Sequence, residues 1–170
     1  MEIRPELPGD WAAAGRLYRK AFVGEYEAEL IDELRAAGVA PIILVATEKD
    51  VLIGHILFAD LGVQVDGRAV PALALAEMAV TAGLQRSGVG SRLVAAGLEA
   101  ARRLHIDAVL VLGHPTYYPR FGFSAARARH LRTSFRGGDA FMALELKAGA
   151  LDGQGGEVTY HPGFRLGPPA

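Results

Sequence analysis

Hydrophobic positions along the chain follow two spacings, which predict helices in some segments and strands in others. Apolar residues recur three or four positions apart over Trp11–Ala21 and again over Glu25–Ala37, which predicts two amphipathic helices. Asp10 precedes the first segment, and its carboxylate is predicted to cap that helix by accepting hydrogen bonds from first-turn N–H groups. Gly38 is predicted to end the second helix.

Continuous apolar runs rich in β-branched residues predict strands. The runs Ile42–Ala46 and Val51–Val65 flank the charged segment Glu48-Lys49-Asp50, so the sequence predicts an antiparallel hairpin there. Asp66-Gly67 predicts a second hairpin turn. Other apolar segments predict further strands at Glu2–Arg4, Ala69–Val80, Ala108–Leu112, Ala140–Leu146 and Glu157–Tyr160.

The amphipathic segment Leu84–Leu104 predicts a helix between the strands at Ala69–Val80 and Ala108–Leu112. Strand, helix and strand in this order form a βαβ unit, whose two strands are parallel. We therefore predict a single α/β domain over residues 1–170, with a mixed, mostly antiparallel sheet flanked by helices. Its core is predicted to span about residues 1–147, and residues 148–170 are predicted to form a C-terminal extension and tail.

The composition narrows the classes of function. The chain has no cysteine, which excludes disulfides, thiol nucleophiles and cysteine-ligated zinc, and its histidines lack the spacing of a metal site. Lys+Arg number 18 and Asp+Glu number 19, so the net charge of -1 offers no uniform basic surface for nucleic acid. No apolar run reaches the ~18 residues of a membrane span, and charges occupy the N-terminal region where a secretory signal would be apolar. We therefore expect a cytoplasmic protein with no metal, nucleic-acid or membrane partner.

One glycine-containing turn carries the strongest chemical signal. After the strand that ends at Val80, the segment Gln85-Arg86-Ser87-Gly88-Val89-Gly90-Ser91 opens the predicted helix. Glycine lacks a Cβ atom, so a ligand can approach the backbone, and the first-turn N–H groups of a helix attract anions. The turn lacks the Lys-Ser/Thr pair of a Walker motif, and Asp107 starts a strand where a Rossmann acidic residue would end one. The segment is therefore predicted to hold a pyrophosphate.

Two motifs together resemble the GNAT superfamily of N-acetyltransferases. A hydrophobic strand that ends in Met78-Ala79-Val80 and is followed by Gln-Arg-x-Gly-x-Gly resembles the acetyl-CoA site of that superfamily. Downstream, Tyr118 and Gly122-Phe123 resemble its Tyr-x-x-x-Gly-Phe element. The resemblance covers about Glu2–Phe123 in element order and is nearest to a branch of small bacterial acetyltransferases. It implies a GNAT-like sheet whose central parallel strand pair is splayed, so that acetyl-CoA inserts there.

The resemblance also implies how acetyl-CoA binds. The backbone at the end of the strand would pair with pantetheine, and N–H groups of the turn would hold the pyrophosphate. The residues assigned to cofactor binding are Met78, Ala79, Val80, Gln85, Arg86, Ser87, Gly88, Val89, Gly90 and Ser91.

Three side chains are candidates for proton transfer. By resemblance, Tyr118 would protonate the leaving CoA thiolate, and it is preferred to Tyr117 because it lies four residues before Gly122. The general base is Glu77 at the end of the strand, or His114, whose imidazole titrates near neutrality, or water. The structural alternatives are an aromatic core contact for Tyr118 and a solvated strand-end charge for Glu77.

The resemblance implies an acetyl-CoA-dependent N-acetyltransferase that moves an acetyl group to a primary amine by direct transfer in a ternary complex. Because the chain has no cysteine, a cysteine-linked acetyl-enzyme is excluded. The alternative is a non-catalytic acyl-CoA-binding or sensing module on the same fold. The acceptor, the acyl-chain preference and the choice between monomer and homodimer stay open.

Overall fold

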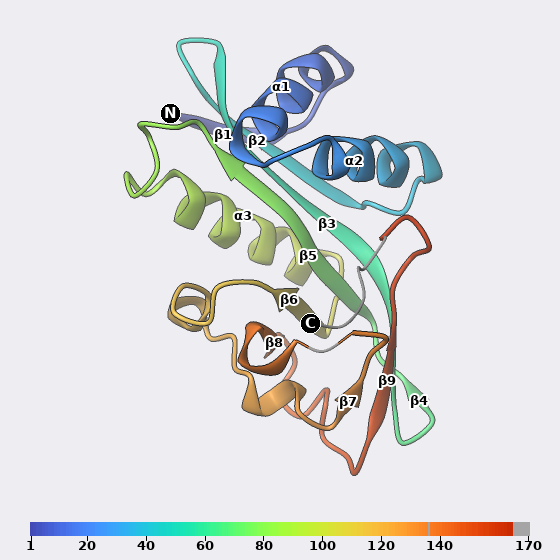
Figure 1. Ribbon diagram of the computed structural model, residues 1–170. Coiled ribbons are helices and arrows are strands. Elements are labelled where there is room, and N and C mark those ends of the chain that lie inside the picture. The colour runs from blue at the N-terminus through green and yellow to red at the C-terminus, as the bar shows by residue number, and fades with distance from the viewer. Residues whose placement is uncertain (136, 165–170) are drawn as a thin grey trace. The chain divides into compact units, whose positions relative to one another are not determined.

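The computed structural model describes residues 1–135 and 137–164, which fall into two compact units (Figure 1). The first unit comprises Met1–Ala59 and Ala76–Ala100, and the second comprises Asp60–Leu75 and Ala101–Ala170. Strands β3 and β5 therefore contribute residues to both units. The assignment of the whole chain to a single domain stays a prediction.

The first unit is built on antiparallel strands. Its strands are β1 (Glu2–Pro5), β2 (Ile42–Glu48), the first part of β3 (Val51–Val65) and the second part of β5 (Ala72–Val80), in that order. The turn between β2 and β3 has a left-handed backbone at Lys49 and Asp50, with φ of 50° and 63°. Two such residues are what a tight hairpin requires, so the predicted hairpin is confirmed.

Helices cover both faces of β3 in this unit (Figure 1). They are η1 (Pro8–Asp10), α1 (Trp11–Ala21), α2 (Tyr26–Ala37) and α3 (Val89–Arg103). Helix α3 packs over Gly54 and Phe58, whereas Tyr18 of α1 contacts His55. Successive strand residues point to opposite faces, so α1 and α3 lie on opposite sides of β3. The helix predicted to end at Gly38 does so, with that glycine in the left-handed conformation (φ 70°).

Asp10 does not cap α1 in the predicted way. Its carboxylate accepts hydrogen bonds from the guanidinium of Arg4, at 2.7 and 3.0 Å, and from the Leu7 N–H at 2.8 Å. The hydrogen bonds from Arg4 hold the pKa of this carboxyl below its usual value. The Asp10 carboxylate therefore binds Arg4 of β1 and not the first turn of α1, to which the local sequence pattern assigned it.

A buried polar network joins α1 and α2 to β3. His55 is 0% exposed, and its Nδ1 and Nε2 atoms lie 2.9 Å from the Tyr18 hydroxyl and 2.9 Å from Oε1 of Glu6. Arg35 of α2 donates two hydrogen bonds to the same Glu6 carboxylate, at 2.7 and 3.0 Å. Burial acts to raise the pKa of Glu6, but the hydrogen bonds from His55 and Arg35 outweigh it and hold that pKa below its usual value. The buried carboxylate is thus fully compensated.

Helix α3 lies unusually close to β3 because two glycines face the contact. A Cβ atom on Gly97 would fall 2.2 Å from Cε2 of the buried Phe58 ring. A Cβ atom on Gly54 would fall 2.9 Å from Leu93 and 3.0 Å from Val89, at the start of α3. The missing side chains let the helix backbone settle against the strand, which fixes where α3 begins.

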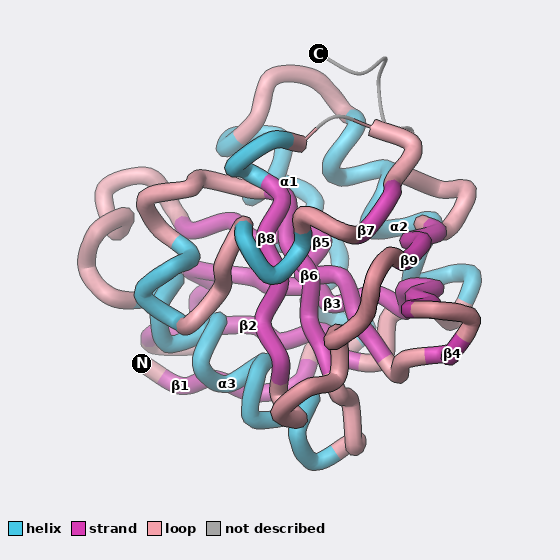
Figure 2. The backbone as a smooth tube through the Cα atoms, turned by 90° about the horizontal axis from the view of Figure 1, so that it is seen from below, coloured by secondary structure: helices cyan, strands magenta, loops and turns pink. Residues whose placement is uncertain are grey.

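The second unit completes a mixed sheet. Figure 2 shows β6 and β8 side by side, and these strands are antiparallel. Strand β6 is parallel to the first part of β5, from Ala72 opposite Ala108 to Leu75 opposite Val111. The mixed, mostly antiparallel sheet with a parallel pair is therefore confirmed. The remaining elements of this unit are β4 (Arg68–Ala69), β6 (Ala108–Leu112), η2 (Tyr118–Phe121), η3 (Ala126–Ala128), β7 (Leu131–Arg132), η4 (Gly138–Ala140), β8 (Phe141–Glu145) and β9 (Gly156–Thr159).

Two sequence predictions for this unit need correction. The strand predicted over Ala69–Val80 is divided into β4 and β5, because Val70-Pro71 interrupts it. The sequence predicts no strand in the arginine-rich stretch that begins at Arg127, but this stretch contains the short strand β7, which pairs parallel to β9. Arg136 of that stretch and residues 165–170 of the predicted tail lie outside the described residues.

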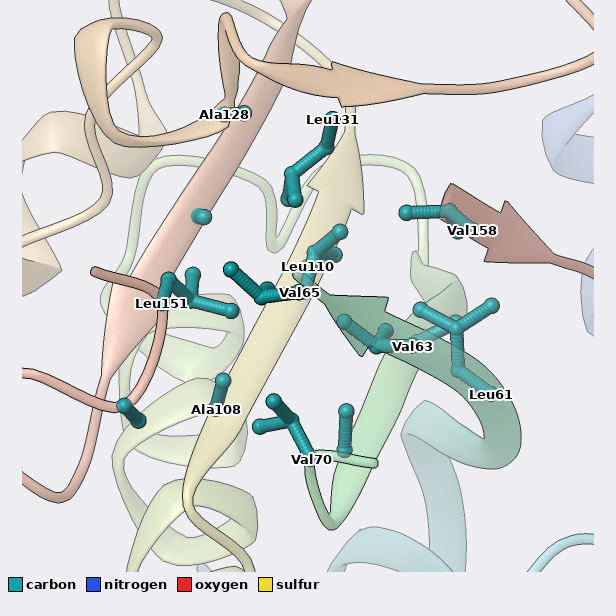
Figure 3. Close-up of a cluster of buried hydrophobic side chains, with 14 of the residues drawn as sticks. Leu61, Val63, Val65, Val70, Ala108, Leu110, Ala128, Leu131, Leu151 and Val158 are labelled. Atoms are coloured by element: carbon teal, nitrogen blue, oxygen red, sulfur yellow. The ribbon is translucent and has the colours of Figure 1, made fainter. Parts of the chain in front are cut away.

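A cluster of apolar side chains forms the core of the second unit (Figure 3). Val63 and Val65 of β3 and Leu110 of β6 contribute to it, together with Leu131 of β7 and Val158 of β9. Strand β9 pairs with β3 over Gly62–Val65, which brings the C-terminal strand to this core. Strand β9, which lies in the predicted C-terminal extension, is thus an integral part of the unit.

We expect Gly97→Ala to destabilise the protein by about 1–3 kcal/mol, because the new methyl group overlaps the Phe58 ring. The gain in helix propensity, about 1 kcal/mol, acts in the opposite direction and is smaller. Gly15→Ala in α1 is the matched control, since its Cβ would meet only the end of the Arg19 side chain at 3.0 Å. Urea unfolding measures both, and a Gly97→Ala protein as stable as the parent contradicts the packing argument.

Candidate functional site

The glycine turn between β5 and α3 has a backbone that a helix cannot adopt. Gly83, Arg86 and Gly88 have φ values of 89°, 64° and 93°. Helix α3 therefore begins at Val89, and the prediction that it begins at Leu84 is wrong by five residues. The residues between Gly83 and Gly88 are all compatible with a helix, so their identities do not indicate that the helix starts later. The backbone conformation is set by the turn as a whole.

Hydrogen bonds within the turn fix its shape. The Leu84 N–H donates to the Thr81 carbonyl at 3.0 Å, and the Ser87 N–H donates to the Leu84 carbonyl at 3.3 Å. The Ser87 hydroxyl also donates to the Leu84 carbonyl. Ser87, assigned to cofactor binding from the sequence, thus directs both of these donors into the turn and stabilises its conformation.

The N-terminal end of α3 combines an exposed backbone at Gly88 with a buried side chain at Val89. The Arg92 N–H donates a hydrogen bond to the Gly88 carbonyl at 3.0 Å, as in the first turn of a helix. The N–H groups at the start of α3 therefore point out of the helix end. A Cβ atom on Gly88 would meet nothing within 4 Å. Val89 is only 5% exposed and packs over Gly54. An exposed backbone on a buried anchor is a suitable cradle for an anion.

Strand β5 leads directly into this turn. Its parallel ladder with β6 ends at Leu75 opposite Val111, and β5 continues to Val80. Met78 and Val80 are partly exposed and Ala79 is buried. The N–H of Thr81, one residue beyond the strand, donates to the Ile53 carbonyl at 2.8 Å. The strand end assigned to pantetheine is thus held in place from β3.

Glu77 is a titratable group in this segment whose ionisation is strongly shifted. Burial raises the pKa of its carboxyl to about 8, and the negative charge of Glu27 on α2 acts in the same direction. A carboxyl in this state is protonated at neutral pH and becomes a stronger base than an exposed one when it ionises. Glu77 is thus partly buried, unlike the solvated strand-end charge that was its structural alternative.

Glu27 is a residue that the sequence analysis did not select. Its Oε2 atom is buried and has no hydrogen-bond partner within residues 1–135 and 137–164. An unpaired buried acceptor costs about 1–3 kcal/mol, and a charged one costs more. The available signal was its position three, four and seven residues before Leu30, Ile31 and Leu34, which places a carboxylate on the buried stripe of α2.

Tyr118 is tightly packed in the second unit. It is 8% exposed, and its ring makes edge contacts with Tyr117 and Phe123 at centroid distances of 5.0 and 5.7 Å. A Cβ atom on Gly113 would lie 2.4 Å from the Tyr118 ring, so that glycine lets the ring close against the end of β6. Gly122 has φ of 98° and turns the chain after η2. The environment orders the tyrosine, and it is compatible with a catalytic or a purely structural role.

His114 precedes η2 and is exposed. Its carbonyl accepts hydrogen bonds from the N–H groups of Tyr117 at 3.1 Å and Tyr118 at 3.4 Å. The structure thus gathers Glu77, the end of β5 and the glycine turn in the first unit, whereas His114 and Tyr118 belong to the second.

No helix within residues 1–135 and 137–164 combines the length and apolarity that a membrane crossing needs. In the same part of the chain, no group of three or more His, Asp or Glu residues could hold a metal ion.

Residues 2–126 match the family model of the acetyltransferase (GNAT) domain. The uncharacterized N-acetyltransferase YhbS of Escherichia coli (strain K12) is 35% identical over 166 residues, which are 96% of this chain and 98% of that protein. The uncharacterized N-acetyltransferase YjhQ of the same strain is 37% identical over 106 residues, 61% of this chain and 59% of that protein.

Solved structures match over nearly the full length. The crystal structure of YhbS from Escherichia coli in complex with CoA has a TM-score of 0.88 at 34% identity and covers 99% of this chain and 94% of that chain. A GNAT family acetyltransferase from Brucella melitensis in complex with acetyl-CoA has a TM-score of 0.75 at 30% identity, with coverage of 96% and 97%.

Proposed function

The chain belongs to the GNAT acetyltransferase family, and we propose that it transfers an acetyl group from acetyl-CoA to a primary amine. The observation that carries this proposal is the open glycine turn at the N-terminus of α3, directly after β5. Similar proteins crystallised with CoA and with acetyl-CoA support the choice of co-substrate.

The first unit supplies groups that fit acetyl-CoA. Backbone N–H groups from Gln85 to Gly90, other than that of Ser87, would hold the pyrophosphate, with Arg86 adding positive charge, and the open space over Gly88 leaves room for it. The backbone of Met78–Val80 would pair with pantetheine as a neighbouring strand does, and its N–H groups would stabilise the oxyanion. Acetyl-CoA supplies the acetyl group as a reactive thioester.

Glu77 is the proposed general base. An amine acceptor with pKa near 10 is mostly an ammonium ion at neutral pH, so a proton must be removed before the nitrogen can attack. A carboxyl with a pKa raised to about 8 accepts that proton more readily than an ordinary glutamate. His114 and water are the alternative bases.

Tyr118 is the proposed general acid, by its place in the family motif. Its hydroxyl would donate a proton to the sulfur of the leaving thiolate. A thiolate with pKa near 8.5 is already a good leaving group, so this proton contributes modestly to the rate. With no cysteine in the chain, direct transfer in a ternary complex is the proposed route.

Gly88→Asp is expected to weaken CoA binding about 10–100-fold, because it places a negative charge and a side chain in the cradle. Calorimetric titration with acetyl-CoA, CoA and NAD measures this, and the parent protein should bind the first two only. Gly67→Asp is the matched control, because Gly67 also has a positive φ (78°) and no neighbour within 4 Å of a Cβ atom. Unchanged affinity in a folded Gly88→Asp protein removes the cradle assignment.

The pH dependence of kcat/KM distinguishes the bases. With an acceptor of pKa near 10, the parent enzyme should gain activity up to about pH 8, where Glu77 is ionised, and then reach a plateau. In Glu77→Gln the rising limb of the pH profile of kcat/KM should move toward the pKa of the amine, because only the neutral amine can then react. A limb that stays near pH 8 eliminates Glu77, and a limb near 6.5 that disappears in His114→Gln assigns the role to His114.

Tyr118→Phe is expected to lower kcat about tenfold and to leave the Kd for CoA unchanged. Single-turnover thiol release measures the first quantity and calorimetry the second. An unchanged rate of thiol release would show that Tyr118 has only a structural role. A parent protein that binds CoA tightly and acetylates no amine supports the non-catalytic acyl-CoA-binding module.

A further inference from the structure

The first unit stabilises the carboxylate of Glu6 with an arginine, whereas no described cation influences the carboxyl of Glu77. Glu6 receives two hydrogen bonds from Arg35. The described influences on the Glu77 carboxyl are its own burial and the charge of Glu27, and neither is cationic. The Oε2 atom of Glu27 is buried and lacks a partner in the part of the chain that the structure describes. A positively charged donor from a bound ligand would satisfy the Glu27 oxygen.

A primary ammonium group matches this pair of carboxyls. It carries one positive charge and three N–H donors, so it can donate to Glu27 and still present a proton to Glu77. A guanidinium also has donors, but it stays protonated and offers no nucleophilic nitrogen. A carboxylate next to the amine, as in a free amino acid, would be repelled by the same charges. The pair therefore favours an amine whose neighbouring atoms carry no negative charge.

We propose that Glu27 is the second carboxylate of the acceptor site and that, with Glu77, it selects primary amines that carry no carboxylate next to the reacting nitrogen. This inference rests on the proposed acetyl transfer. Other acidic residues of α2, such as Glu29 and Glu33, are exposed and do not share the burial of the Glu27 oxygen. Glu27 is thus distinguished from the general negative charge of its helix.

The proposed step balances. The ammonium donates a hydrogen bond to Oε2 of Glu27, and Glu77 in its carboxylate form takes one N–H proton. The nitrogen lone pair forms the C–N bond, and the C–S bond of the thioester breaks. The sulfur gains a proton from Tyr118, the second proton of the nitrogen restores the Tyr118 hydroxyl through solvent, and Glu77 releases its proton, so the net reaction releases one proton to solvent.

The coupling of the two carboxyls is measurable without turnover. The pKa of Glu77 in the folded protein, about 8, lies above its ordinary value of 4.5, so the folded state holds a proton that the unfolded state releases in this window. Stability is therefore expected to fall as the pH rises between these values. Glu27→Gln should reduce the fall in Tm between about pH 5 and pH 8, whereas Glu29→Gln, an exposed change of the same charge on the same helix, should not.

Acceptor selectivity is measured with alaninamide and alanine, in which a carboxamide replaces the carboxylate, and kcat/KM is expressed per neutral amine because the replacement also changes the pKa of the amine. The parent enzyme should prefer alaninamide by about 100-fold or more in kcat/KM, and Glu27→Gln should narrow this ratio about tenfold while Glu29→Gln preserves it. Binding of each compound to the CoA-loaded protein, read as a shift in Tm, gives the same comparison without catalysis.

The outcomes separate the two proposals. A protein that binds no CoA contradicts the proposed function, and the pH dependence of Tm then still decides whether Glu27 and Glu77 are coupled. A folded Glu27→Gln protein with the parent's selectivity ratio and the parent's pH dependence overturns the role of Glu27. Equal use of alaninamide and alanine by the parent enzyme overturns the proposed substrate class even if acetyl transfer occurs.

Discussion

The close approach of α3 to β3 is the constraint on which the first unit depends. Gly54 and Gly97 remove the side chains that would hold the helix away from the strand, and Phe58 and Val89 fill the contact. Because the helix cannot slide or tilt over these positions without a clash, its first turn is held at the end of the glycine turn that follows β5. The exposed N–H groups at that end gain their orientation from a contact two turns farther along the helix.

The buried carboxyl groups of the first unit differ in their hydrogen-bond partners. Glu6 is surrounded by Arg35 and His55, and its charge is stabilised within the fold. Burial and the negative charge of Glu27 favour the protonated form of Glu77, and the Oε2 atom of Glu27 has no hydrogen-bond partner among the described residues, which is unfavourable for the isolated protein. Such an arrangement persists where it serves a task beyond folding, since local conflicts with good packing concentrate at functional sites.

Local patterns were sufficient to predict much of this molecule. The hairpin of β2 and β3, the two N-terminal helices and the parallel pair of β5 and β6 follow from apolar periodicity and element order. The start of α3 was not predictable in the same way, because Arg86 adopts a left-handed backbone that only the closed turn imposes. Glu27 lay on a helical stripe whose burial became evident only with the strands beneath it. The partner of Asp10 was equally hidden, since Arg4 belongs to another element.

Strand β9 has a consequence for how the chain is handled. It pairs with β3 on one side and with β7 on the other, so both strands depend on it for part of their backbone hydrogen bonding. A chain shortened to residue 147 would expose the edge of β3 beside an apolar core. Unprotected edges of this kind recruit strands from neighbouring molecules, and the shortened protein would therefore be prone to aggregate during expression.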